Sequence, residues 1–151
     1  MLIVDDEIAV GSTLRLVLQG EHDVHVATSA LDALQLMSQV EFDAVVCDVA
    51  MPGMTGIELY DAVRQSQPGR EARMIFMTGG TLIPQSQEFL SRLENPLLEK
   101  PFDTEALRSS LRRLDAPSAQ RRLAHRVDRQ RVAILHEHWP IEREAAHCEV
   151  D

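Results

Sequence analysis

The sequence predicts an α/β fold with a doubly wound, five-stranded parallel sheet, followed by a C-terminal tail. Short apolar runs alternate five times with amphipathic segments of helical length, a pattern typical of βαβ crossovers. The clearest run, Ala44–Cys47, is uninterrupted in its apolar character, as parallel strands covered on both faces are. The alternation stops at Asp115-Ala116-Pro117-Ser118. We therefore expect one domain over residues 1–115 and a partly helical or disordered tail over residues 116–151.

Five strands are expected from apolar runs that end in polar or turn-forming residues. They are Leu2–Val4, Val24–Ala27, Ala44–Cys47, Met74–Met77 and Leu97–Leu98. Cys47 lies inside one of these strands and Cys148 lies near the end of the chain. Two such cysteines do not make a disulfide framework, so we expect Cys47 to be a buried apolar residue.

Five helices are expected from apolar residues spaced three or four apart. Ser29 can cap the second helix with its hydroxyl, Pro84 can open the fourth, and Asp103 or Thr104 can cap the fifth. In chain order, the apolar stripes are Leu14, Val17 and Leu18; Leu31, Leu34 and Met37; Ile57, Leu59 and Val63; Phe89, Leu90 and Leu93; and Leu107, Leu111 and Leu114.

Composition narrows the class of protein. The chain is 44% hydrophobic and 26% charged, which is ordinary for a soluble globular protein. No apolar run approaches the ~20 residues that a membrane span needs. The first residues turn acidic without a basic region, so we expect no signal peptide and a cytoplasmic protein.

The net charge of −9 is unevenly distributed. Residues 1–115 hold 18 acidic and 9 basic residues, whereas residues 116–151 hold 6 of each. An acidic body argues against nucleic acid as its partner. The arginines of residues 121–131 favour an amphipathic helix with a solvated basic face over nucleic-acid binding, because no DNA-binding motif accompanies them. His136, His138, His147 and Cys148 fit no standard zinc spacing.

Polar side chains gather where the expected strands end. The five residues are Asp5, Asp6, Asp48, Thr78 and Lys100, from four strands. Carboxyl ends of parallel strands meet at one edge of the sheet, where ligands bind near a topological switch point. Each residue alone would be an ordinary strand end, cap or turn. Together, three carboxylates and the only lysine of the chain indicate a site for a divalent cation and a transferable phosphoryl group.

At these residues the sequence resembles the receiver domain of response regulators in two-component signalling. The matching segments are Ile3-Val4-Asp5-Asp6-Glu7, the run from Asp48 to Gly56, Met77-Thr78-Gly79 and Lys100-Pro101-Phe102. Thr78-Gly79-Gly80 and the run from Leu98 to Asp103 look most like receivers attached to hybrid histidine kinases. The resemblance covers residues 1–115. It implies the flavodoxin-like (βα)5 receiver fold and a cis peptide bond before Pro101.

The resemblance also implies a Mg²⁺ ion as cofactor. Asp6 and Asp48 would be direct ligands, Asp5 a direct or water-mediated one, and the backbone carbonyl of Ala50 another. This oxygen set suits Mg²⁺, which takes few carboxylates and keeps several waters. Gathered carboxylates should repel one another and raise at least one pKa when the metal is absent.

Asp48 would be the phospho-acceptor, its carboxylate attacking phosphorus to give an acyl phosphate. Lys100 would contact a phosphoryl oxygen as a point charge, and the Thr78 hydroxyl would hydrogen-bond the phosphoryl group. The implied partners are a histidine kinase or phosphotransfer protein and a downstream effector protein, with a homodimer left open. We expect a phosphoryl acceptor and signalling switch rather than an enzyme.

Two alternatives stay open on the sequence. One is a degenerate receiver that only binds proteins, although such domains usually lose an acid or the lysine and none is lost here. The other is a phosphatase with an aspartate nucleophile, which would need a second acid where Ala50 stands.

Leu97 replaces an aromatic residue that often acts as a rotating switch in receivers. Output through helix and loop shifts is therefore expected instead.

Overall fold

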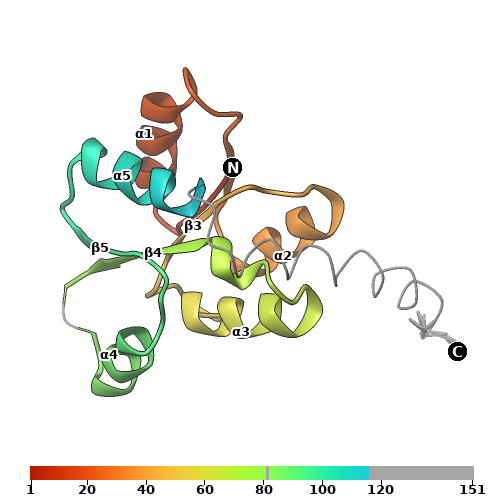
Figure 1. Cartoon of the computed structure of the whole chain (residues 1–151), viewed down its shortest axis with the longest axis vertical. Coiled ribbons are helices and arrows are strands. Elements are labelled where there is room, and N and C mark those ends of the chain that lie inside the picture. The colour runs from red at the N-terminus through yellow and green to blue at the C-terminus, as the bar shows by residue number, and fades with distance from the viewer. Residues whose placement is uncertain (81, 116–151) are drawn as a thin grey trace, which may run out of the picture. The chain divides into compact units, whose positions relative to one another are not determined.

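The structure, a computed structural model, describes residues 1–80 and 82–115, which form a five-stranded sheet flanked by five helices (Figure 1). All four strand pairings are parallel, in the order β2-β1-β3-β4-β5. The strands are β1 (Leu2–Val4), β2 (His25–Ala27), β3 (Val45–Asp48), β4 (Met74–Gly79) and β5 (Leu97–Lys100). The helices are α1 (Ile8–Leu18), α2 (Ala30–Gln39), α3 (Gly56–Ser66), the short 3-10 helix η1 (Glu71–Arg73), α4 (Pro84–Ser91) and α5 (Thr104–Asp115). The doubly wound fold class is confirmed.

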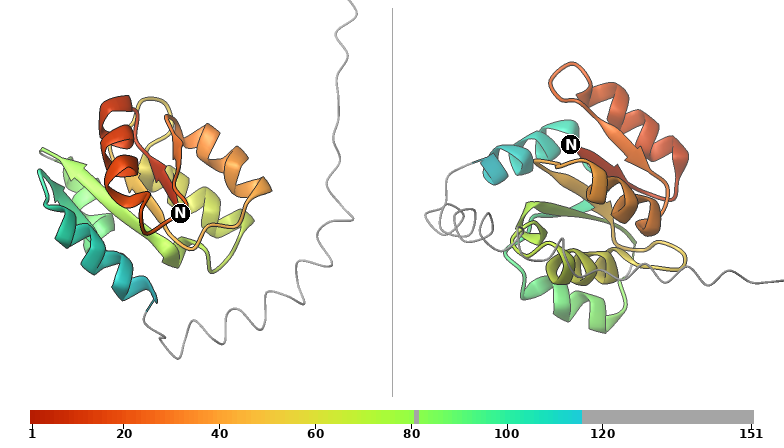
Figure 2. Two further views of the ribbon diagram at one scale, coloured as in Figure 1. Left: turned by 90° about the horizontal axis from the view of Figure 1, so that it is seen from above. Right: turned by 90° about the vertical axis from the view of Figure 1, so that its right-hand side faces the viewer.

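Side chains that alternate along the strands divide the core into two layers. In β1, Leu2 and Val4 belong to the core cluster that also holds residues of α2, α3 and α4, whereas Ile3 belongs to the cluster that holds residues of α1 and α5. The two helical layers lie on opposite faces of the sheet (Figure 1; Figure 2). Because both faces are covered, the central strands carry almost only apolar residues.

Three helices begin at the residues that the sequence predicts. Ser29 Oγ accepts a hydrogen bond from the Asp32 N–H at 3.1 Å, and Pro84 is the first residue of α4. For α5, Asp103 rather than Thr104 caps the first turn, since its carboxylate accepts the Ala106 N–H at 2.6 Å. The Lys100–Pro101 peptide bond is cis, as the resemblance implied.

Parts of the expected helix faces are wrong. Val17 is 37% exposed and Leu31 is 66% exposed. On α2 the buried stripe is Ala30, Ala33 and Met37, whose i, i+3, i+7 spacing keeps one face toward the sheet and turns the neighbouring Leu31 to solvent. Met37 is buried and Leu34 packs against the core as expected, so on this helix only Leu31 is wrong. Small alanines at this contact are a weaker sequence signal than leucine.

Boundaries also shift by a few residues. β4 continues through Gly79, so Thr78 belongs to a strand rather than to a turn, and β5 reaches Lys100. α4 ends at Ser91, so Leu93 lies beyond it while still packing against the core. The expectations for the arginine-rich segment, the late histidines and Cys148 lie outside the described residues. In the described part of the chain, no helix is long and apolar enough to cross a membrane.

The strand order places a switch point beside β1. From β1 the chain first adds β2 on one side, then crosses to add β3 on the other. Helices leaving β1 and β3 therefore diverge to opposite faces of the sheet and open a crevice between the carboxyl ends of these two strands. Asp5 follows β1 directly and Asp48 is the last residue of β3.

Candidate functional site

Asp5 is held at the end of β1 by contacts on both its backbone and its side chain. Its N–H donates to the carbonyl of Ala27 at 3.2 Å, which continues the β1–β2 pairing by one residue. Its Oδ1 accepts the Glu7 N–H at 2.9 Å. The side chain is 1% exposed, and its remaining oxygen, Oδ2, faces Lys100. A carboxylate buried this deeply needs a positive partner.

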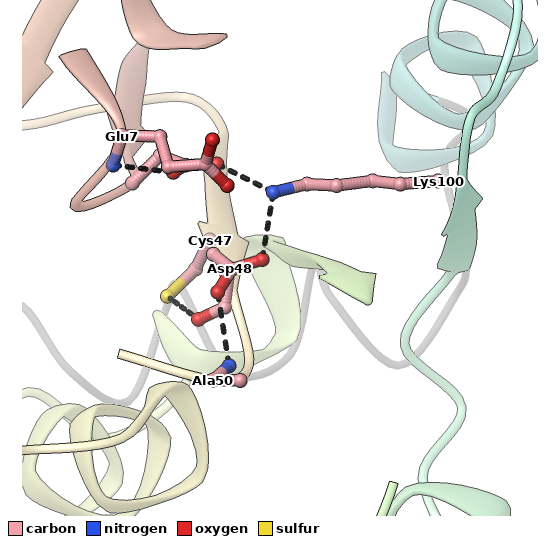
Figure 3. Close-up of polar contacts among 6 residues, drawn as sticks. Glu7, Cys47, Asp48, Ala50 and Lys100 are labelled. Carbon is pink, nitrogen blue, oxygen red and sulfur yellow. Dashed lines mark hydrogen bonds and ion pairs between the residues drawn. The ribbon is translucent and has the colours of Figure 1, made fainter. Parts of the chain in front are cut away.

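Asp48 is likewise held at the end of β3 by contacts of both its carboxylate oxygens. Its Oδ2 accepts the Ala50 N–H at 3.0 Å, closing an Asx-type turn, so Oδ1 is left to face Lys100 (Figure 3). The Cys47 thiol donates to the Asp48 carbonyl at 3.1 Å. Burial raises the pKa of Cys47, with the nearby negative charges of Asp48 and Asp5 adding to the effect, so this thiol is a packed neutral group.

Lys100 joins the two carboxylates from the far side of β4. Its Nζ lies 2.8 Å from Asp5 Oδ2. The same Nζ lies 2.9 Å from Asp48 Oδ1 (Figure 3). In the β4–β5 register Lys100 pairs with Gly79, and a Cβ placed on Gly79 would lie in ordinary van der Waals contact with the lysine Cδ at 3.5 Å. The lysine stem therefore runs beside Gly79 as it crosses β4 to reach the crevice.

The charges of these three residues do not cancel, since two carboxylates face one ammonium. Burial raises the pKa of Asp48 above its ordinary value; the Lys100 ammonium opposes this and the Asp5 carboxylate adds to it. Burial acts to lower the pKa of Lys100, but its hydrogen bonds to Asp5 and Asp48 outweigh burial and raise that pKa. The expectation of one raised carboxylate pKa is confirmed, with burial rather than repulsion as its largest cause.

Thr78 adds a buried hydroxyl to the same edge of the sheet. Its Cα follows Met77, the β4 partner of Asp48, and the side chain is almost fully enclosed. Within residues 1–80 and 82–115 its Oγ1 finds no hydrogen-bond partner. An unsatisfied buried hydroxyl costs about 1–3 kcal/mol. This hydroxyl is therefore available to a group that reaches this edge of the sheet.

The remaining two residues of the expected site lie at its rim. Asp6 and Ala50 are both exposed. Among the described residues, no three carboxylate, imidazole or thiol side chains form a ready metal-ligand cluster.

A Mg²⁺ ion nevertheless fits the donors that are present. It takes one or two protein carboxylates and keeps several waters, so a convergent cluster of three is not needed. Each carboxylate oxygen of Asp5 and Asp48 accepts one hydrogen bond from the described residues, which leaves lone pairs free. The surplus negative charge beside Lys100 is also of the sign that a divalent cation would offset.

Asp48→Asn is expected to raise the thermal stability of the metal-free protein at neutral pH. Because folding raises the pKa of Asp48, the wild type loses stability as pH rises from the ordinary value of 3.8 through the folded-state pKa, whereas asparagine does not titrate. The advantage should vanish below that window. Melting curves with a chelator, from acid to neutral pH, measure it, with Asp6→Asn as the exposed control. An Asp48→Asn variant less stable than the wild type at neutral pH would contradict this sign.

Sequence reasoning missed two contributors to the site, the Ala50 N–H and Gly56. The first is a backbone group and has no side-chain signal beyond the turn-forming character of Asp48 itself. The second is the first residue of α3, and its fit depends on the distance between α3 and β3. Only its place at the end of the loop after Asp48 was visible in the sequence.

A parallel sheet with paired carboxylates and a lysine at its switch point is the architecture of a receiver. The family model of the response regulator receiver domain matches residues 1–112, and the chain belongs to that family.

Relatives include both transcription regulators and a kinase. The chain is 30% identical to the transcriptional regulatory protein ZraR of Klebsiella oxytoca over 112 residues, covering 74% of this chain and 25% of ZraR. It is 31% identical to the sensor kinase CckA of Brucella abortus over 118 residues, covering 76% of this chain and 12% of CckA. The chain thus spans a quarter or less of these two proteins. The match to a kinase supports in part the expected likeness to kinase-attached receivers.

A solved structure has a similar fold. The chemotaxis protein CheY4 of Vibrio cholerae is similar with a TM-score of 0.65 and 31% identity, over 75% of this chain and 95% of CheY4. The compared part of this chain is therefore close to a whole receiver.

Proposed function

We propose that this protein accepts a phosphoryl group on Asp48 from a histidine kinase or phosphotransfer protein, with Mg²⁺ bound, and signals to an effector protein. The observation that carries the proposal is the Lys100 ammonium, held within 3 Å of both buried carboxylates at the switch point. Phosphoryl transfer depends mainly on such positioning and on charge stabilisation. A chain that had lost this function would have no need to bury two carboxylates beside a partly buried ammonium.

The chemistry assigns one role to each group. A carboxylate oxygen of Asp48 forms the new bond to phosphorus, while the bond to the donor breaks and its electron pair leaves with the donor. Lys100 moves from bridging two carboxylates to contacting a phosphoryl oxygen. The Thr78 hydroxyl, unpaired among the described residues, donates to another of these oxygens. Asp6, Asp48 and the Ala50 carbonyl would hold a Mg²⁺ ion, with Asp5 a direct or water-mediated ligand. The bound ion would supply further positive charge near the phosphoryl oxygens.

The two alternatives fare less well. A degenerate receiver should lack an acid or the lysine, but Asp5, Asp48 and Lys100 are present and paired. A phosphatase of the aspartate-nucleophile kind needs a second acid two residues after Asp48, where this chain has the methyl group of Ala50. We therefore propose that the protein is a phosphoryl acceptor and switch rather than a hydrolytic enzyme. We also propose that residues 1–115 are the receiver domain and that residues 116–151 are a tail.

Incubation with a small phosphodonor such as acetyl phosphate, or with a phosphorylated histidine kinase, tests the proposal. The intact mass should increase by one phosphoryl group when Mg²⁺ is present and should not change when a chelator removes it. Labelling that ignores the chelator would contradict the metal assignment, and no labelling from any donor would contradict the proposed function.

Mg²⁺ is expected to stabilise the folded protein, because the ion binds the native site and not the unfolded chain. The gain is about 2.7 kcal/mol at a free concentration one hundred times the dissociation constant. Thermal melts over a Mg²⁺ titration measure it, and Asp6→Asn should shift the titration to higher concentration. A melting temperature that millimolar Mg²⁺ leaves unchanged would count against a metal site.

A further inference from the structure

The first turn of α3 packs against the backbone of Asp48 more closely than any side chain would allow. A Cβ placed on Gly56 would lie 2.3 Å from the Asp48 carbonyl oxygen and 3.1 Å from its carbonyl carbon. It would also lie 3.1 Å from Cys47 Sγ. Real Cβ atoms do not approach a neighbour within 3.0 Å. Gly56 has no positive φ, so space rather than backbone conformation requires a glycine here.

The Asp48 main chain that a Cβ at position 56 would meet is held in place by hydrogen bonds of its own. The Val49 N–H donates to the Met77 carbonyl at 2.9 Å, and the Gly56 N–H donates to the Val49 carbonyl at 3.0 Å. The peptide after Asp48 is thus clamped between β4 and α3. Unlike a side-chain end, it cannot rotate away from a new methyl group.

The start of α3 is itself fixed by a capping box. Thr55 Oγ1 accepts the Glu58 N–H at 3.2 Å, and Glu58 Oε2 accepts the Thr55 N–H at 2.7 Å. Hydrogen bonds that the Thr55 N–H and the Thr55 hydroxyl donate to the Glu58 carboxylate lower its pKa, so the box is intact at neutral pH. The helix therefore presents a defined surface to the backbone of Asp48.

We infer that Gly56 is a positioning residue for phosphoryl acceptance, and this inference rests on the proposed function. Gly56 lets α3 support the main chain of Asp48 directly, so that the carboxylate reaches Lys100 with one oxygen and the Ala50 N–H with the other. A methyl group at position 56 displaces either the helix start or the Asp48 main chain. A displacement of about 1 Å at reacting groups lowers a rate by roughly a hundredfold.

Gly56→Ala tests the inference through the rate of labelling by acetyl phosphate with Mg²⁺. The maximal rate should fall by about ten- to a hundredfold, while the donor concentration at half-maximal rate stays unchanged. Two controls separate positioning from general damage. Gly20→Ala adds the same methyl group where nothing lies within 4 Å, and Val63→Ala loosens α3 at a buried position away from Asp48. Both should keep the wild-type maximal rate below their melting temperatures.

A second measurement does not depend on phosphorylation. Because Lys100 is the only lysine, protein with ¹³C-labelled lysine gives a single Cε signal from the site. Gly56→Ala should shift this signal in the metal-free protein, whereas Gly20→Ala and Val63→Ala should not. If Gly56→Ala does not fold, Thr55→Ala replaces it as the variant that frees the helix start, and Thr55→Ser should restore the wild-type rate and signal.

The outcomes separate the inference from the proposed function. An unshifted Lys100 signal together with a Gly56→Ala rate equal to that of Val63→Ala overturns the inference. If Thr55→Ala is the variant measured, a wild-type rate and signal overturn it in the same way. A wild type that no donor labels overturns the proposed function, and the Lys100 signal then decides whether Gly56 positions Asp48.

Discussion

Lys100→Met is expected to slow phosphoryl transfer to Asp48 by about a hundred- to a thousandfold, the usual loss when one preorganised charge-stabilising group is removed from a reacting site. Methionine keeps much of the length of the side chain but offers no positive charge to the phosphoryl oxygens. The rate of mass increase with acetyl phosphate and Mg²⁺ measures the effect. Lys100→Arg should recover little of the rate, because a planar guanidinium does not replace a compact ammonium between two carboxylates.

The same variant should also be less stable at neutral pH, by about 3 kcal/mol, because it leaves Asp5 and Asp48 buried without their positive partner. The raised pKa of Lys100 means that its stabilising contribution in the wild type is complete below its ordinary value of 10.5 and is lost only as pH rises beyond it. The deficit of the variant should shrink in acid, where the Asp48 carboxylate, whose pKa is raised, becomes protonated. Denaturant unfolding without Mg²⁺ measures it, and a variant as stable as the wild type would show that the ion pairs contribute nothing.

Thr78→Val should have opposite effects on the two states of the protein. Without a phosphoryl group, replacing an unpaired buried hydroxyl by a methyl group should stabilise the fold by about 1 kcal/mol. With beryllofluoride, a phosphoryl mimic, the lost hydrogen bond to a charged group should weaken binding by roughly tenfold or more. Thermal melts and a beryllofluoride titration followed by NMR measure the two effects.

Thr78→Ser is the matched control, since it keeps the hydroxyl and should bind beryllofluoride as the wild type does. Chemical-shift changes should then spread from the site to α4, β5 and α5, near Phe89, Leu97 and Leu107. A Thr78→Val variant that is destabilised would show that the hydroxyl has a partner before phosphorylation. Shift changes confined to the loops around Asp48 and Thr78 would favour a passive phosphate acceptor over a switch.

The place of the site was predictable because parallel strands put their carboxyl ends at one edge. Asp5, Asp48 and Lys100 each end an apolar run, so their meeting followed from the fold class alone. The pairing of Lys100 with both carboxylates did not follow from the fold class. Whether Lys100 reaches one carboxylate or both depends on the register of β5 against β4, which no local pattern encodes.

The parts that sequence reasoning missed are those set by distances between elements. Leucine spacing predicts Leu31 on the buried face of α2, but that face carries the small side chains of Ala30 and Ala33 instead. The same holds for Gly56, because its need for space arises only when α3 lies against β3. Buried leucines of α5, by contrast, were predicted correctly, since Leu107, Leu111 and Leu114 form an unambiguous stripe.

The most direct test of the central claim is to identify the residue that carries the phosphoryl group. The labelled protein is reduced with borohydride, which converts an aspartyl phosphate to homoserine, and is then digested and sequenced by mass spectrometry. The account predicts homoserine at position 48 alone in the wild type, and no homoserine in Asp48→Asn treated in the same way. Reduction at Asp5 or Asp6, or labelling that persists in Asp48→Asn, would contradict it.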